Sequence, residues 1–500
     1  MSRKSRATFL RTCSSANAQV YAIKYHLKPD SHKVNPVYNC LLVSTYELGH
    51  QPFGLAEPAA VLRQIGAVVE TLDLAVEGLD EAAFRRAGLI AFYVPMHTAT
   101  RLAAQLIAKV RGWNPTAHVA AYGLYAPMNE VYLRHLGVQT VLGGEFEDGL
   151  AALAQRLERG VEAAPGEQLE PRVSVARQDF VIPDRDGLPS LDRYAYLRLP
   201  NGDRQTAGYV EASRGCKHRC RHCPVVPVYN GRFRIIPREI VLADVRQQAA
   251  AGARHISFGD PDFFNGPTHA LRIVEAMHEE FPELTYDVTI KVEHLLVHAK
   301  LLPVLEHTGC LFVTTAVESV DDRVLAILDK GHTREDFFQV VRLFDEVGLS
   351  LAPTFVAFTP WTTLDGYLDL LKVIAGLGLI RSVAPVQLAI RLLIPPGSRL
   401  LELAEIRALV GPLDEAALVY PWSNSDSRID KLQTQIQALV QRAGTKSNDQ
   451  LFGEIWRLAH DHAGRSAPPV PAMGTRRTPA QLSEPWYCCA EPTQEQFALL

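Results

Sequence analysis

The sequence lacks the features that would place it in a membrane, on a nucleic acid or in an oxidising compartment. No apolar run approaches the roughly eighteen residues that a membrane-spanning helix needs. The formal net charge of the 500 residues is −4, so no overall basic field attracts nucleic acid. Cysteine is scarce, with 8 residues in the chain, which argues against a disulfide framework. We therefore expect a cytoplasmic protein with neither a membrane nor a nucleic-acid partner.

Acidic residues are also missing from the first 29 positions, which are basic and rich in serine. This composition occurs in organelle transit peptides, but also in disordered extensions and in sequences read from too early a start codon. We expect one of the two latter explanations in a bacterial protein, and we treat residues 1–36 as a basic extension.

Strand and helix signals alternate along residues 37–160. Five apolar strand signals separated by helices predict a doubly wound parallel sheet, an α/β fold whose ligands bind beyond the carboxyl ends of its strands. The expected strands are Asn39–Thr45, Ala67–Leu74, Leu89–Val94, His118–Tyr125 and Gln139–Leu142.

A second alternating block covers residues 206–398, after a proline-rich linker at 161–205. Its six strand signals predict a partial (β/α)6 barrel with active residues at the C-terminal strand ends. Residues 399–463 are predicted to be helices that close the open side of the barrel, and residues 464–500 to be an extended tail. The expected barrel strands are Tyr209–Ser213, His255–Phe258, Thr285–Ile290, Leu311–Val317, Leu351–Phe358 and Val386–Leu393.

Three cysteines, Cys216, Cys220 and Cys223, follow the first of these strands at C-x3-C-x2-C spacing. Three thiolates would hold a four-iron cluster at three corners and leave one iron open for a substrate or cosubstrate. Basic neighbours, namely Arg214, Lys217, Arg219 and Arg221, are expected to favour the thiolate form. The alternative is a zinc site completed by His218 or His222.

The cysteine spacing resembles the signature of the radical S-adenosylmethionine (SAM) superfamily. The resemblance implies that the open iron of a [4Fe-4S] cluster binds SAM. It also implies that an electron, delivered by a donor such as flavodoxin or ferredoxin, cleaves SAM to an adenosyl radical.

Other segments resemble this superfamily in the expected order. The stretch Gly259-Asp260-Pro-Asp262 matches the Gly–acid segment that receives the SAM amino group, with Asp260 the first choice and Asp262 the second. Either aspartate could instead cap the turn before the next helix, and both roles can coexist.

Three further matches involve Glu318-Ser319, His222 and Gly397. The resemblance implies that Glu318, in a Glu-Ser turn, reaches the SAM ribose, and that His222 packs near the adenine. Gly397, in a Pro-Pro-Gly segment, would let the backbone approach the nucleoside. Alternatively, Glu318 caps the next helix, His222 is a solvated histidine, and Gly397 forms a plain tight turn.

The first α/β block resembles the cobalamin-binding domain found before many radical SAM domains. Its first loop, Glu47-Leu-Gly-His50-Gln-Pro-Phe-Gly54, departs from the Asp-x-His-x-x-Gly pattern that carries a cobalt-ligating histidine. We expect His50 to be a solvated loop residue. The domain either binds cobalamin without a histidine ligand or has lost this cofactor.

The tail stretch Cys488-Cys489-Ala-Glu491-Pro492 resembles that of the CUAEP/CCAEP-tail radical SAM proteins, some of which carry selenocysteine at the position of Cys489. Neighbouring soft donors can hold a thiophilic element such as arsenic or selenium, form a redox pair or bind a metal. We predict that Cys488 and Cys489 take part in catalysis, tuned by Glu491. A merely structural pair is the alternative.

Three functions follow from these patterns. The first is a radical SAM enzyme that modifies a small molecule with help from the tail cysteines. The second is a cobalamin-dependent radical SAM methyltransferase, and the third is a non-enzymatic metal- or cluster-binding redox sensor. RNA methylthiolation is disfavoured, because that group uses an N-terminal cysteine triad and only Cys13 and Cys40 precede the cysteine loop.

Overall fold

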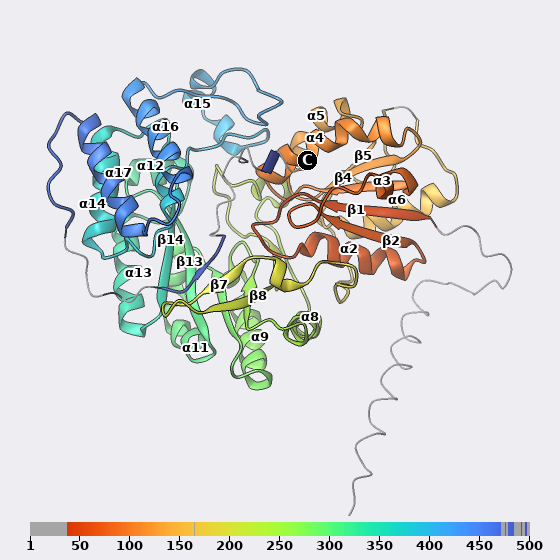
Figure 1. Ribbon diagram of the computed structural model, residues 1–500, viewed down its shortest axis with the longest axis horizontal. Coiled ribbons are helices and arrows are strands. Elements are labelled where there is room, and N and C mark those ends of the chain that lie inside the picture. Colours follow the sequence, from red (N-terminus) through yellow and green to blue (C-terminus); the bar gives the residue numbers. More distant parts are fainter. Residues whose placement is uncertain are drawn as a thin grey trace, which may run out of the picture. The chain divides into compact units, whose positions relative to one another are not determined.

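A computed structural model describes residues 38–164, 166–471, 476, 479–484, 492 and 496–497 (Figure 1). The basic extension at 1–36 and the predicted catalytic residues Cys488, Cys489 and Glu491 lie outside the described residues. Within these ranges, no helix has both the length and the apolar character needed to cross a membrane.

The first block forms a parallel sheet with the strand order β2-β1-β3-β4-β5-β6. All five predicted strands are present, and Val173–Ser174 (β6), from the predicted linker, adds a short sixth. The five strands are β1 (Asn39–Ser44), β2 (Val68–Asp73), β3 (Leu89–Tyr93), β4 (His118–Tyr122) and β5 (Thr140–Gly144).

Helices cover both faces of this sheet (Figure 1). On one face, α2 (Phe53–Gln64) and α6 (Glu147–Glu158) pack with the strands into one apolar core. On the other, α3 (Glu81–Arg86), α4 (His97–Trp113) and α5 (Glu130–His135) contribute to a second core. Burial on both faces explains why the central strands are almost continuously apolar, and the doubly wound prediction is confirmed.

The second block forms a seven-stranded sheet in the order β14-β13-β12-β11-β8-β7-β15. The first five of these are parallel neighbours, and β7 and β15 add an antiparallel edge. Their bounds are β7 (Tyr196–Arg198), β8 (Arg204–Val210), β11 (His255–Phe258), β12 (Thr285–Thr289), β13 (Cys310–Glu318), β14 (Ser350–Phe355) and β15 (Gln481–Leu482).

The prediction of a sixth barrel strand at Val386–Leu393 is wrong. Residues Pro385–Leu388 form a 3-10 turn (η5), and only an isolated parallel bridge joins Phe358 to Arg391. Pro385 has a fixed φ and no N–H to donate to a ladder, so it starts a helical turn instead. The barrel is therefore built from five parallel strands.

The open side of the barrel is covered by helices and by part of the tail. Helices α16 (Ser427–Gln441) and α17 (Asn448–His462) pack against η5, and α17 also packs against α14 (Leu364–Gly376; Figure 1). The tail strand β15 pairs with β7, while the Gln481 side chain donates a 2.6 Å hydrogen bond to the Arg381 carbonyl beyond α14. This tail segment thus links the edge strand to the opposite end of the sheet.

A buried ionic cluster joins the first block to the barrel. Arg214 lies on β9 (Ser213–Gly215) and is 7% exposed. It pairs with Glu57 of α2, with Glu147 at 2.6 Å, with Glu211 at 2.7 Å and with Glu145 at 3.7 Å. Burial raises the pKa of Glu57 and Glu211, and raises that of Glu145 to about 7. One guanidinium therefore compensates four crowded carboxyl groups.

We predict that Arg214→Met destabilises the protein by about 3–5 kcal/mol near pH 8, because it leaves buried carboxylates without their cation. The loss should be smaller near pH 5. A carboxyl group whose folded-state pKa is raised opposes folding only once it ionises, and Glu145 is protonated there. Thermal unfolding at both pH values measures the difference.

The matched control is Arg172→Met, which removes a 65% exposed side chain paired with Glu130 at 2.9 Å. It should change stability by no more than about 1 kcal/mol. An equal loss for both variants, or a loss for Arg214→Met that is independent of pH, would contradict the proposed balance of charges.

Candidate active site

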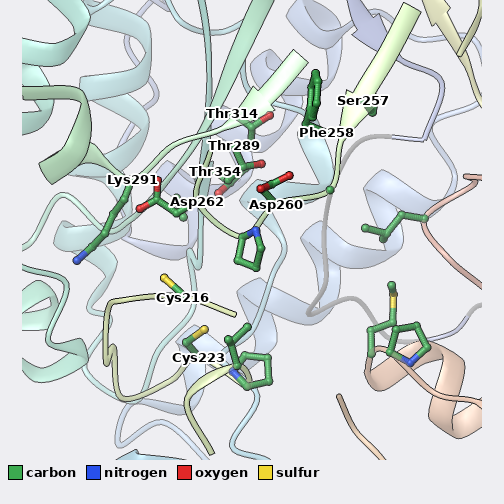
Figure 2. A pocket seen from close by; sticks show the side chains of 18 of the residues that line it. Cys216, Cys223, Ser257, Phe258, Asp260, Asp262, Thr289, Lys291, Thr314 and Thr354 are labelled. Carbon is green, nitrogen blue, oxygen red and sulfur yellow. The ribbon is translucent and has the colours of Figure 1, made fainter. Parts of the chain in front are cut away.

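The loops at the carboxyl ends of both sheets line one cavity of about 420 Å³ (Figure 2). This is the edge at which parallel α/β sheets bind their ligands. The first block contributes residues at or just after the ends of β1, β3, β4 and β5, namely Glu47, His50, Pro95, Met96, Leu124, Tyr125, Gly144 and Phe146. The barrel contributes the cysteine loop and residues at the ends of β11, β12, β13 and β14, among them Asp260, Asp262, Lys291, Glu318 and Thr354.

All three cysteines of the loop line this cavity, and Figure 2 shows Cys216 and Cys223 on its wall. The loop leaves β9 at Gly215, whose φ is +73° and whose added Cβ would lie 2.5 Å from the Arg232 carbonyl oxygen. Only glycine fits this close approach between paired strands. The backbone therefore fixes the point at which the cysteine loop enters the cavity.

The basic residues near the cysteines do not act as the sequence suggested. Arg214 is held by glutamates, and Arg221 donates to the carbonyls of Ala326 and Ile327 at 3.2 and 2.8 Å. Burial raises the pKa of the Cys216 thiol to about 11. A favoured thiolate is therefore not found at Cys216, and a bound metal ion would have to deprotonate this thiol.

Lys330 is a buried cation that interacts electrostatically with two of the thiols. Burial alone would lower its pKa, but Glu318 and the thiols of Cys220 and Cys223 raise it. The sequence carried no pattern that marked this lysine, because it lies twelve residues beyond Glu318 along the chain and reaches it only in the fold.

The two loop histidines differ in their surroundings. His218 has Lys291 Nζ 3.0 Å from Nδ1 and Asp262 Oδ2 3.4 Å from Nε2, so both of its ring nitrogens already face a charged side chain. His222 has Nε2 3.1 Å from Glu318 Oε1. A Cys3His zinc site with His218 is therefore disfavoured by the geometry.

Asp260 and Asp262 follow β11 and line the cavity, but they have different partners. Asp260 accepts hydrogen bonds from the Ala212 N–H at 2.9 Å and the Ser213 hydroxyl at 2.5 Å, and burial raises its pKa to about 7. Asp262 accepts the Phe264 N–H at 3.1 Å, which is the turn-capping role considered above.

Gly259 also lines the cavity, and its added Cβ would lie 1.9 Å from the Tyr209 hydroxyl oxygen, which excludes a side chain there.

Glu318 ends β13 with a φ of +70° and lines the cavity beside His222. Burial alone would raise its pKa, but Lys330, whose Nζ is 3.3 Å away, and His222 hold the pKa at about 2. The carboxylate is therefore ionised and acts as an acceptor.

Ser319 and Gly397 are not among the described residues that line the cavity. Ser319 caps a turn by accepting the Asp321 N–H.

The first loop places two unexpected side chains in the cavity. His50 is buried, 4.9 Å between ring centroids from Tyr209, and burial lowers its pKa to about 4. The expectation of a solvated His50 is wrong, because the loop packs against the barrel. Glu47 is also buried, burial raises its pKa, and its Oε2 atom has no hydrogen-bond partner among the residues that the structure describes.

Part of the chain is similar to known protein families. Residues 210–362 match the model of the radical SAM superfamily. A putative methylthiotransferase of Methanocaldococcus jannaschii is 24% identical over 305 residues, covering 59% of this chain and 66% of that protein. A tRNA-2-methylthio-N(6)-dimethylallyladenosine synthase of Chlorobium chlorochromatii is 29% identical over 146 residues, covering 27% and 32%. The chain thus spans less than two thirds of the length of either relative.

Two solved structures share the fold over most of the chain. The cobalamin-dependent SAM radical enzyme OxsB, with aqua-cobalamin and SAM bound, has a TM-score of 0.66 at 16% identity, covering 89% of this chain and 76% of that one. The radical SAM methyltransferase TsrM of Kitasatospora setae, with cobalamin and a [4Fe-4S] cluster bound, has a TM-score of 0.53 at 18% identity, covering 68% and 70%. These likenesses confirm the predicted fold class.

We predict that Cys220→Ala lowers the iron content after anaerobic reconstitution from about four irons per chain to less than about one, because a cubane needs all three thiolates. Iron analysis and the visible absorbance of the cluster measure this loss. Cys40→Ala is the control, since Cys40 is buried in β1 of the other sheet and should leave the iron content unchanged. Full iron content in Cys220→Ala would refute the assignment.

Proposed function

We propose that this chain is a radical SAM enzyme, which reductively cleaves SAM and modifies a small-molecule substrate in the cavity that its two sheets share. One observation carries the proposal: three thiols on one loop border the same cavity as the acidic ends of β11 and β13. When bound, a [4Fe-4S] cluster supplies the electron that breaks a carbon–sulfur bond of SAM.

The residues around the thiols suit a zwitterionic and cationic cosubstrate. Asp260 is fixed by two hydrogen bonds and borders the cavity, so it can receive an ammonium group, which would also lower its pKa. Glu318 is ionised, and its Oε1 atom is taken by His222 and Lys330, which leaves Oε2 to accept ribose hydroxyls. Burial of these groups keeps water from competing for them.

The part of the cavity formed by the first block fits a corrinoid. Its wall is largely apolar, and the buried carboxyl group of Glu47 has an oxygen without a hydrogen-bond partner in the described part of the chain. Because burial raises the pKa of Glu47, this group can donate a hydrogen bond to an amide carbonyl of the kind that surrounds a corrin ring. Bound cobalamin would supply a methyl carrier. OxsB and TsrM, which share the fold, were both solved with cobalamin bound, and this supports a cobalamin-dependent methyltransferase as the second candidate.

Methylthiolation of RNA is less well supported, although one relative is named a putative methylthiotransferase and another a tRNA-2-methylthio-N(6)-dimethylallyladenosine synthase. Of the two cysteines before the cysteine loop, Cys40 is 2% exposed inside β1, where it cannot join a cluster without breaking the sheet. We therefore keep a small molecule as the substrate, and an electron donor such as flavodoxin or ferredoxin as the protein partner.

The tail cysteines are proposed to take part in the reaction. On one side, Glu484 lines the cavity and accepts a 2.9 Å hydrogen bond from the Tyr46 hydroxyl. On the other side, Phe497 packs against a cluster that includes Leu48 and Met96, which also line the cavity. Cys488 is four residues from Glu484, a distance of at most about 14 Å along an extended chain. Chain length therefore allows Cys488 and Cys489, with Glu491 beside them, to reach the cavity and hold a soft element such as arsenic or selenium.

We expect the reconstituted, dithionite-reduced protein to convert SAM to 5′-deoxyadenosine or S-adenosylhomocysteine, which mass spectrometry distinguishes. After incubation with hydroxocobalamin and desalting, visible absorbance should show about one corrinoid per chain, since the cavity has one such wall. Absence of both SAM products contradicts the enzyme assignment. Absence of corrinoid alone contradicts only the cobalamin-dependent candidate.

We predict that Cys489→Ala loses stoichiometric retention of arsenite in the cluster-loaded protein, because a trivalent soft element needs the thiol pair. Elemental analysis after desalting measures the bound arsenic. Cys310→Ala is the control, since Cys310 is 5% exposed in the barrel core. Equal arsenic retention by Cys489→Ala and the parent protein would exclude this role.

A further inference from the structure

Three side-chain atoms suited to metal binding converge beside the cysteine loop. His218 belongs to that loop, Asp262 follows β11, and His294 lies in α10 (Val292–Val297). His294 Nδ1 is 2.7 Å and His218 Nε2 is 3.4 Å from Asp262 Oδ2, and all three atoms lie within 4.8 Å of one another.

None of the three atoms makes a hydrogen bond of acceptable geometry among the described residues, although each is buried. The side chains of His218, Asp262 and His294 are 15%, 1% and 12% exposed. Among the described residues, the polar contacts of the three atoms are with one another, as the two ion pairs of Asp262 with His218 and His294. Both imidazoles thus direct a ring nitrogen at the same buried carboxylate oxygen, which is an arrangement that a shared cation would also stabilise.

The spacing matches that of ligands around a first-row metal ion. Bonds of about 2.0–2.2 Å place neighbouring ligand atoms about 2.9 Å apart at right angles and about 3.4 Å apart at a tetrahedral angle. The observed separations of 2.7 and 3.4 Å lie close to these values. Two imidazoles and one carboxylate are a donor set that suits zinc or iron(II).

We propose that His218, Asp262 and His294 form a second metal site, separate from the three cysteines, that binds a divalent first-row transition-metal ion. His218 and Asp262 line the cavity. The remaining coordination positions therefore face the cavity and take an oxygen donor, such as a carboxylate or hydroxyl group, from a small molecule bound there. This site stands independently of SAM cleavage.

The charged neighbours Lys291 and Glu293 allow metal binding if His218 exchanges its contact with Lys291 for one with Glu293. Metal bound at His218 Nε2 places the ring proton on Nδ1, where Glu293 Oε2, 3.6 Å away, accepts it. Lys291 Nζ currently lies 3.0 Å from both His218 Nδ1 and Glu293 Oε2. On metal binding, Lys291 leaves His218 and keeps its pairing with Glu293.

The test uses the cluster-loaded protein, so that the three cysteine thiols are occupied and do not bind zinc. After chelator treatment and titration with zinc chloride, elemental analysis should find about one zinc ion per chain in addition to about four irons. His294→Ala and Asp262→Asn should each weaken zinc binding by about 10-fold to 100-fold or more. Iron content and circular dichroism establish that each variant is folded and loaded.

The matched control is His298→Ala, which removes a neighbouring imidazole 5.7 Å from His294 between ring centroids but outside the three ligands. It should retain the zinc ion. Three outcomes overturn the site: no zinc beyond the cluster, equal zinc binding by His294→Ala and the parent protein, or zinc uptake only in proportion to lost iron. A protein that binds zinc at this site yet fails to cleave SAM would overturn the proposed function and leave this site intact.

Discussion

The buried pairing of Arg214 with four glutamates is the interaction on which the geometry of the site depends. Arg214 lies two residues before Cys216, and its partners Glu57, Glu145 and Glu147 belong to the first block. The same guanidinium therefore fixes the entry of the cysteine loop and orients the neighbouring sheet across the cavity. Because separating a buried charge from its partner costs about 3–5 kcal/mol, these contacts strongly favour one relative position of the cysteine loop and the first block.

Because Arg214 is paired with glutamates, its charge is not available to stabilise thiolates in the cavity. Lys330 and Lys291 are both engaged, with Glu318 and Glu293 respectively, and burial raises the pKa of Cys216. Cys216 is thus held as a thiol until a metal ion displaces its proton. The same balance favours a cationic cosubstrate, since Asp260 and Glu318 both border the cavity.

The sequence predicted the parts of the fold that depend on local pattern. Strands buried on both faces, such as Leu89–Tyr93, are continuously apolar, and the cysteine spacing is visible within eight residues. Contacts between distant segments were not predictable: His50 is buried because its loop packs on Tyr209, and the two-residue strand β15 has no periodicity of its own. The strand expected at Val386–Leu393 does not form, because Pro385 begins a helical turn even though the residues after it are largely apolar.

The central claim is that three cysteines hold a cluster with one iron open to SAM. Electron paramagnetic resonance of the reduced, reconstituted protein tests it most directly. The account predicts a [4Fe-4S]+ signal whose g-values shift when SAM is added, because SAM then coordinates the open iron. A signal unchanged by SAM, or a protein that binds zinc and no iron at Cys216, Cys220 and Cys223, would contradict it.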